Sequence, residues 1–271
     1  MPEGDTVWLT AHNLDAALRG QVLTRTDFRV PQLAVASLAG ETVTEVVSRG
    51  KHILLRTYAR RSLHSHLRMD GSWHLYPAGG RWRAPSHTAR VVLETASRQA
   101  VGFRVHDLAI VATDAEDELV GHLGPDLLGP DWDRAEALRR LLAEPERTIG
   151  EALLDQRNLA GIGNLYKAES LFLRGINPWT AVGDVADLGS LVDTAQRLLE
   201  ANKNHPEQST TGSLRRGDHR YVFERARRPC LRCRTLIEIA EQGPPPQQRL
   251  TYWCPQCQPS TASGDQLKYR E

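Results

Sequence analysis

Residues 158–164 read Asn-Leu-Ala-Gly-Ile-Gly-Asn and stand between two segments of helical pattern, 148–154 and 165–174. Two glycines in so short a connection predict a tight turn in which backbone amides can come close to a bound group. Asn164 is expected to cap the helix that follows, whose positive end favours a phosphate. The alternative reading is that the glycines only make the turn and Asn164 only caps.

The surrounding region has the pattern of a small helical domain. Before it, two Gly-Pro pairs within residues 121–131 suggest a hinge. Thr148 and Glu151 have the spacing of a capping box. The apolar periodicity predicts four helices, over 133–143, 148–154, 165–174 and 187–201.

The N-terminal part has a different pattern. Residues 5–19 are predicted to form an amphipathic helix capped by Asp5, and short alternating runs follow, separated by turn residues. Such regularly spaced strands favour a β-sandwich or barrel. The expected strands are 21–29, 41–47, 51–57, 62–66, 72–76, 90–94, 101–105 and 109–113.

The first residues have a chemistry of their own once Met1 is removed. Pro2 then presents a secondary amine, and an α-amino group has a pKa near 8, so part of it is uncharged at neutral pH. Such an amine can attack a carbon electrophile, and its adduct is an iminium that keeps a positive charge. Glu3 can transfer a proton beside it. The alternative is an ordinary disordered terminus.

The cysteines predict a metal site. The chain has four, Cys230, Cys233, Cys254 and Cys257, in two Cys-x-x-Cys pairs that flank a predicted hairpin. Four thiolates complete a tetrahedral Zn²⁺ site with no open position, so we expect one structural zinc ion. Arg249 follows the hairpin turn and can reach a phosphate. Residues 202–220 have the composition of a mobile linker.

Charge and hydropathy bound the location and partners. The formal net charge is only +1, but residues 214–257 hold nine arginines and four acids, a local excess that suits a phosphate backbone. No apolar run reaches 18 residues, so no membrane span is expected. Paired cysteines of this kind indicate the cytoplasm, in association with the nucleoid.

Together these patterns predict an α+β multidomain chain. A leading helix and β-sandwich, residues 1–123, precede a helix–two-turns–helix domain, 131–203, a zinc-finger hairpin, 220–258, and a disordered tail, 259–271.

The motifs, in this order, resemble those of the bacterial formamidopyrimidine-DNA glycosylase and endonuclease VIII family. The resemblance covers residues 2–257, and its actinobacterial second endonuclease VIII branch is the most similar. The motifs that carry it are Pro-Glu-Gly at 2–4, Arg-Gly-Lys-His at 49–52, Gly-His-Leu-Gly-Pro at 121–125, the stretch 158–166, and the cysteine finger with Arg249.

The resemblance implies a monomeric base-excision-repair enzyme that acts on duplex DNA with oxidised bases or abasic sites. Pro2 would attack C1′ and expel the base, with Glu3 assisting proton transfer. Elimination would then cut the strand, and a second, δ, elimination would leave a gap. Family members flip the target nucleotide out of the helix. Lys51, His66, Asn164 and Arg249 would grip phosphates, and Met69, beside Arg68, would fill the vacated space.

Three departures from the family pattern bear on the substrate. Thr6 stands where members usually carry a glutamate, the Arg-Arg-Phe triplet of guanine-lesion enzymes is not evident near 101–104, and the segment 202–220 is short. These favour oxidised pyrimidines. The alternatives are an oxidised-purine glycosylase and a non-catalytic protein that binds damaged DNA.

Overall fold

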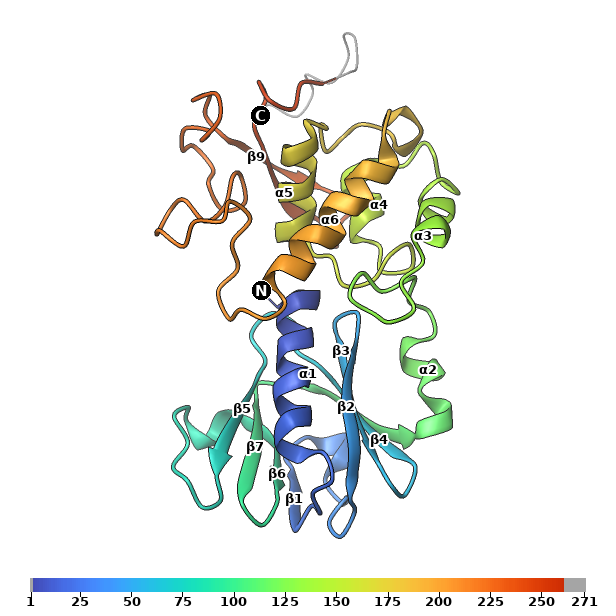
Figure 1. Cartoon of the computed structure of the whole chain (residues 1–271), viewed down its shortest axis with the longest axis vertical. Coiled ribbons are helices and arrows are strands. Elements are labelled where there is room, and N and C mark those ends of the chain that lie inside the picture. The colour runs from blue at the N-terminus through green and yellow to red at the C-terminus, as the bar shows by residue number, and fades with distance from the viewer. Residues whose placement is uncertain (1, 261–271) are drawn as a thin grey trace. The chain divides into compact units, whose positions relative to one another are not determined.

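The computed structural model describes residues 2–260, and the chain divides between His122 and Leu123 into two compact units (Figure 1). The described residues also include four short 3-10 segments: η1 (Pro31–Leu33), η2 (Ser86–Thr88), η3 (Thr113–Ala115) and η4 (Val182–Asp184).

The first unit consists of one long helix and two antiparallel sheets. Helix α1 (Gly4–Leu18) comes first, and a short helix, α2 (Asp117–Val120), comes last. One sheet has the order β1-β6-β7-β5 and the other β2-β3-β4-β8. The strands are β1 (Arg25–Phe28), β2 (Val43–Arg49), β3 (His52–Thr57), β4 (Arg61–His66), β5 (Ser72–Pro77), β6 (Ala89–Glu94), β7 (Arg98–Phe103) and β8 (Asp107–Ala112).

A single core joins the helix to both sheets. Strand alternation sends Ile53 and Leu55 of β3 inward, where they share a buried cluster with Val91 of β6 and with Val7 and Leu14 of α1. The predicted sandwich with a leading helix is therefore confirmed. Apolar burial of this kind also fixes α1 in place, and with it the residues at its start.

The ends of the elements differ from the prediction where tertiary contacts decide them. Helix α1 begins at Gly4 with Glu3 as its N-cap residue, so the predicted cap at Asp5 was wrong. The residues before Arg25 are not part of strand β1, and an isolated bridge joins Val22 to Thr42. The predicted strand 101–105 begins at Arg98 because pairing with β5 and β6 extends that far.

The second unit contains the predicted four helices and a two-stranded hairpin. The hairpin lies between the two cysteine pairs, as predicted. The helices α4, α5 and α6 pack around one buried cluster that also includes Cys230 and Cys254. The elements are α3 (Arg134–Leu141), α4 (Ile149–Leu154), α5 (Asn164–Arg174), α6 (Leu188–Asn202), β9 (Glu238–Gln242) and β10 (Arg249–Trp253).

Two predicted helix caps differ from the structure. Thr148 Oγ1 donates to Glu151 Oε2 at 2.5 Å, and Thr148 makes no side-chain cap bond to the backbone, so the two side chains pair with each other. Helix α5 starts at Asn164 itself, with Gly163 in the N-cap position. The prediction that Asn164 caps this helix was therefore wrong, and its side chain has a different partner.

One carboxylate holds the segment predicted to be a mobile linker at Thr210, together with the residues that directly follow that segment. Glu169 of α5 is fully buried and accepts hydrogen bonds from the backbone amides of Tyr221, Val222 and Phe223 at 2.8–2.9 Å, and from the hydroxyl of Thr210. Charged acceptors make strong bonds in a buried setting. The segment therefore has a defined path, which its polar composition did not reveal.

Residues 261–271 of the predicted tail lie outside the described part of the chain. Within residues 2–260, no helix has both the length and the apolar character needed to cross a bilayer.

Candidate functional site

Two buried acidic residues follow Pro2 in the sequence at the start of α1. Pro2 is half-buried, Glu3 is fully buried, and Asp5 has an exposed fraction of only 1%. The backbone amide of Val7 donates to the Glu3 carbonyl at 3.0 Å, which makes Glu3 the first residue held by the helix. A secondary amine at Pro2 would therefore stand on a rigid support with two acids within three residues.

The predicted residues Lys51 and His66 are brought together by strand pairing. Gly50 has φ of 58° and, with half-exposed Lys51, makes the tight connection between β2 and β3. Only glycine adopts this left-handed conformation without strain. The next residue, His52, is the direct cross-strand partner of His66 at the end of β4. Two residues that are 15 positions apart in sequence therefore lie at one edge of the sheet.

The residues after β4 have two different settings. Arg68, at φ of 52°, is held by Asp107 through contacts of 3.0 Å from Nε and 2.7 Å from Nη2. Met69 is 67% exposed, which is unusual for a side chain of this kind. The following residue, Asp70, is paired with Arg104. Met69 is thus the apolar side chain of this turn that projects into solvent.

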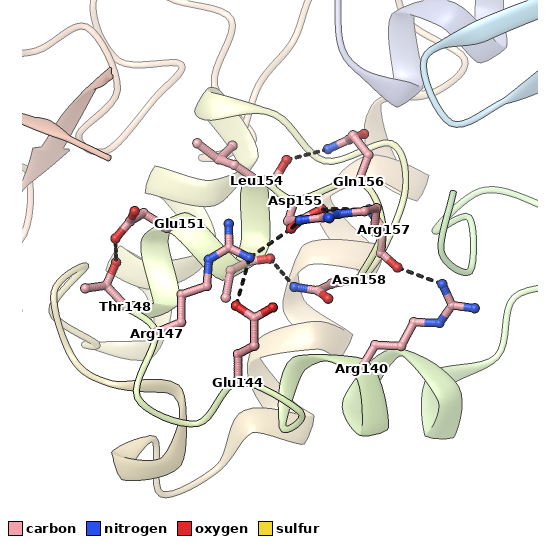
Figure 2. Close-up of polar contacts among 11 residues, drawn as sticks. Arg140, Glu144, Arg147, Thr148, Glu151, Leu154, Asp155, Gln156, Arg157 and Asn158 are labelled. Carbon is pink, nitrogen blue, oxygen red and sulfur yellow. Dashed lines mark hydrogen bonds and ion pairs between the residues drawn. The ribbon is translucent and has the colours of Figure 1, made fainter. Parts of the chain in front are cut away.

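In the second unit, one glutamine shapes the glycine-rich connection between α4 and α5. Gln156 Nε2 donates to the carbonyls of Leu154 and Ile162 at 3.0 and 2.9 Å, and its Oε1 accepts from the amide of Gly161 at 3.1 Å. Figure 2 shows Gln156 next to Asp155 and Arg157 on this connection. Gly161 has φ of 99°, as the turn requires.

An acidic residue holds the start of the same connection. Asp155 Oδ2 accepts from Arg157 at 2.6 Å and from Arg147 at 2.8 Å (Figure 2). The bonds from Arg157 and then Arg147 hold the pKa of Asp155 well below its usual range, against the effect of burial. Because it stays ionised, Asp155 keeps both arginines in place at neutral pH.

The Gly-His-Leu-Gly-Pro motif meets the glycine-rich connection directly. Gly124 donates its amide to the Gln156 carbonyl at 2.8 Å, and the amide of Ala160 donates to the Pro125 carbonyl at 2.8 Å. A Cβ on Gly124 would lie 2.6 Å from the carbonyl oxygens of Arg157 and Asn158. Glycine is required at this position because the two backbones approach so closely.

Asn164 joins the start of α5 to the finger hairpin. Its Nδ2 donates to the backbone oxygen of Leu250 at 2.7 Å, and its Oδ1 is buried without a hydrogen-bond partner among the described residues. Leu250 follows Arg249, whose side chain is exposed. Asn164 therefore lies next to the residue that follows Arg249. These two predicted phosphate contacts are 85 positions apart in the sequence.

The four cysteines form one compact group. Their sulfur atoms all lie within 4.8 Å of one another, with Cys230 to Cys257 at 4.0 Å and Cys233 to Cys254 at 3.4 Å. A tetrahedral metal with thiolate bonds of about 2.3 Å separates its sulfurs by roughly 3.8 Å. This donor set can hold a metal ion, and its closed geometry fits a structural one.

Sequence reasoning missed four side chains that the fold places at these sites. His52 and His64 form a hydrogen-bonded pair, with Nδ1 and Nε2 2.7 Å apart, and His122 lies near them. Gln156 was also missed. The available signal was the alternation of His64 and His66, which places both on one face of a strand.

Comparisons with known families follow the same division of the chain. The family model described as formamidopyrimidine-DNA glycosylase N-terminal domain matches residues 1–108. The model described as formamidopyrimidine-DNA glycosylase H2TH domain matches residues 123–210.

Curated relatives match over nearly their whole length. A "Probable endonuclease 8 2" from Streptomyces coelicolor is 55% identical over 97% of this chain and 95% of its own. The DNA-(apurinic or apyrimidinic site) lyase Nei2 of Mycolicibacterium smegmatis is 44% identical over 95% of this chain and 99% of its own. An endonuclease 8 of Escherichia coli is 31% identical over 95% of this chain and 100% of its own.

Solved structures share the fold. Lactococcus lactis Fpg, crystallised with DNA containing N7-benzyl-Fapy-dG, has a TM-score of 0.79 at 23% identity, over 96% of this chain and 100% of its own. MutM in complex with DNA containing carbocyclic 8-oxo-G has a TM-score of 0.80 at 22% identity, over the same shares.

The role of Gln156 can be tested by Gln156→Glu. A carboxylate cannot donate to the Leu154 and Ile162 carbonyls and would place a charge against them. We expect the free energy of unfolding to fall by about 2–3 kcal/mol, measured by urea denaturation. Gln247→Glu at an exposed position is the matched control. A change at Gln156 no larger than the control would show that its side-chain bonds do not hold the connection.

Proposed function

This chain belongs to the formamidopyrimidine-DNA glycosylase and endonuclease VIII family, and from that premise we propose that it removes oxidised pyrimidines from duplex DNA. It is a base-excision-repair DNA glycosylase that also cleaves the strand at abasic sites, and its relatives include endonuclease 8 enzymes and a DNA-(apurinic or apyrimidinic site) lyase. The observation that carries the assignment of roles is the placement of Pro2 directly before the buried Glu3.

We propose Pro2 as the nucleophile. Its nitrogen bonds to C1′ of the damaged nucleoside while the bond from C1′ to the base breaks, and the base leaves with a proton. Opening of the sugar ring gives an iminium, and its positive charge acidifies the C2′ proton. Loss of that proton expels the 3′ phosphate. A second elimination at the 5′ side, followed by hydrolysis of the iminium, frees the enzyme and leaves a one-nucleotide gap.

We propose Glu3 as the proton-transfer group beside Pro2. Because Glu3 is buried, its carboxylate is shielded from bulk water. It can therefore exchange protons with the sugar rather than with solvent. Thr6 removes the family's usual second glutamate from this helix. Asp5, in the same turn, is also buried.

Four residues are proposed to bind phosphates around the flipped nucleotide. Lys51 and His66 belong to the first unit and lie at the same end of β3 and β4. Asn164 and Arg249 belong to the second unit, where Asn164 donates to the backbone oxygen of Leu250, the residue after Arg249. Exposed Met69 is proposed to fill the space left in the duplex, and Arg68, held by Asp107, supports the turn that carries it.

We propose that the cysteine group binds one Zn²⁺ ion. All four cysteines would bind as thiolates, and the ion would hold the base of the β9–β10 hairpin that carries Arg249. With no open coordination position, the ion would supply structure and take no part in the elimination steps.

The domain boundaries, the monomeric state and the nucleoid-associated cytoplasmic location stay predictions. Oxidised-purine removal is the alternative function, because the solved structures that share the fold include complexes with 8-oxo-G and Fapy-dG DNA. The lack of the Arg-Arg-Phe triplet favours pyrimidines. A non-catalytic role in binding damaged DNA is the other alternative.

Covalent trapping tests the nucleophile and the substrate together. Mature protein, confirmed by intact mass to lack Met1, is incubated with borohydride and duplexes that carry an abasic site, thymine glycol or 8-oxoguanine. We expect a covalent adduct with the abasic and thymine glycol duplexes, at a rate at least tenfold above that with 8-oxoguanine. The Pro2→Gly variant should lose most of this covalent adduct.

Each other outcome assigns a different function. Faster reaction with 8-oxoguanine would support the purine alternative. Binding to the abasic duplex without any adduct from the wild-type protein would support a non-catalytic role and contradict the proposed mechanism.

The phosphate role of Arg249 predicts a particular salt dependence. Arg249→Ala should weaken binding to damaged and undamaged duplexes by a similar factor and reduce the slope of log affinity against log salt by about one. Fluorescence anisotropy at several KCl concentrations measures both. Arg139→Ala, on the exposed face of α3, is the control. A loss confined to one lesion would contradict a phosphate contact.

The metal proposal predicts one zinc per chain by atomic emission. Chelation should unfold the hairpin and abolish DNA binding while the far-UV signal of the β-sheets persists, because a structural zinc ion stabilises only its local fold. Zinc-free protein that binds DNA normally would overturn the assignment.

A further inference from the structure

Three histidines lie together on one face of the β2-β3-β4-β8 sheet. His52 follows the Gly50–Lys51 turn directly and pairs across the strands with His66, while His64 lies two residues earlier on the same face of β4. His52 Nδ1 is 2.7 Å from His64 Nε2. The rings of His52 and His66 meet edge to face, with centroids 4.7 Å apart.

The hydrogen bonds determine where the protons are. His64 Nδ1 is buried and has no partner among the described residues. An unpaired lone pair is tolerated better than an unpaired N–H group in such a place. The His64 proton is therefore on Nε2, and it is donated to Nδ1 of His52. Neutral His52 then carries its own proton on Nε2.

The same reasoning applies to His66. The backbone amide of Arg68 donates to His66 Nδ1 at 3.0 Å, so this nitrogen holds a lone pair and the proton lies on Nε2. Protonation of Nδ1 would break that bond. His66 thus presents a single neutral N–H donor in a fixed direction.

The surroundings keep all three rings neutral. Burial, and then the neighbouring histidines, lower the pKa of His52 to about 3, and burial, then Arg68, lower the pKa of His66 to about 4. Burial also lowers the pKa of His64. The groups that face the cluster are these three rings, His122, Lys51, Arg68 and Asp107, of which only Asp107 is acidic.

We propose that His52 is a positioning residue that holds His66 as a neutral donor to a DNA phosphate and fixes the turn that carries Lys51. His64, through its bond to His52 from the adjacent strand, holds the orientation of that ring. The two phosphate contacts are then coupled through one side chain. This inference rests on the proposed function, in which Lys51 and His66 contact DNA.

The experiment measures the dissociation constant of the full-length mature protein with a tetrahydrofuran-containing duplex by anisotropy. His52→Leu has a similar volume but cannot accept from His64. We expect it to weaken binding about tenfold without changing the salt slope, because no charge is lost. His52→Asn, whose Oδ1 can replace the accepting nitrogen, should stay within about threefold of the wild type. His87→Leu, at an exposed position, is the control and should have no effect.

Double variants separate positioning from general destabilisation. His52→Leu should add clearly less to His66→Ala than it costs the wild type, because of its two roles only the support of the Lys51 turn remains. In the Arg249→Ala background, in the other unit, it should keep its full effect. An equal effect in both backgrounds, or none in the wild type, would overturn the inference. If His52→Leu lowers the thermal midpoint too far to assay, His52→Ser serves in the same comparison.

The pH dependence gives an independent readout. The ratio of dissociation constants of His66→Ala and the wild type should stay constant from pH 8 to pH 6, since the imidazole is neutral throughout. A ratio that grows as the pH falls through 6.5 would mean a cationic contact and would contradict the neutral donor. Stability should decrease between pH 6.5 and 4, because the unfolded histidines bind protons that the folded ones do not.

The outcomes also separate this inference from the proposed function. If Lys51→Ala and His66→Ala leave binding unchanged, the proposed phosphate contacts are wrong. If both weaken binding and His52→Leu does not, only the positioning role is wrong.

Discussion

The bond from Asn164 Nδ2 to the backbone oxygen of Leu250 is the contact on which the geometry of the second unit depends. It fixes the first residue of α5 against β10, next to Arg249. The buried Lys167 repeats the connection one turn later by donating to Thr251 at 2.7 Å. A helix start and a hairpin that are distant in sequence therefore act as one surface, with the proposed metal at the other end of the hairpin.

That contact requires the connection between α4 and α5 to adopt one conformation. The three bonds of Gln156 and the close approach of Gly124 leave the backbone of residues 156–161 little freedom. Buried polar groups that are fully paired specify one arrangement, because any other leaves a donor or acceptor unpaired. The two glycine motifs of the sequence are thus the two sides of one backbone contact.

In the first unit, side chains on a sheet position the proposed contact residues. The core side of β3 and β4 is apolar, and the opposite side carries the three histidines. Neutral imidazoles suit this place because they donate and accept without the desolvation cost of a charge. In the proposed function, Lys51 and Arg249 supply attraction that depends on salt, while His66 and Asn164 supply direction. Affinity and geometry then come from different residues.

Local patterns in the sequence were enough to identify the kinds of element and the chemistry of the motifs. Alternation and helical periodicity are local signals, so the eight strands of the first unit and the four helices of the second were found, with errors at their ends. The paired cysteines, Pro2 and Glu3 were evident from residue type and spacing.

The contact partners of these residues, by contrast, depend on how distant segments pack together. Asn164 does not cap its helix because the backbone oxygen of Leu250 is within reach, and the segment around Thr210 is held because Glu169 is buried beneath it. His52 and His66 meet because strand register aligns them. Each of these contacts joins residues that the local pattern treats as independent, and sequence periodicity contains no information about which distant backbone atom lies opposite a side chain.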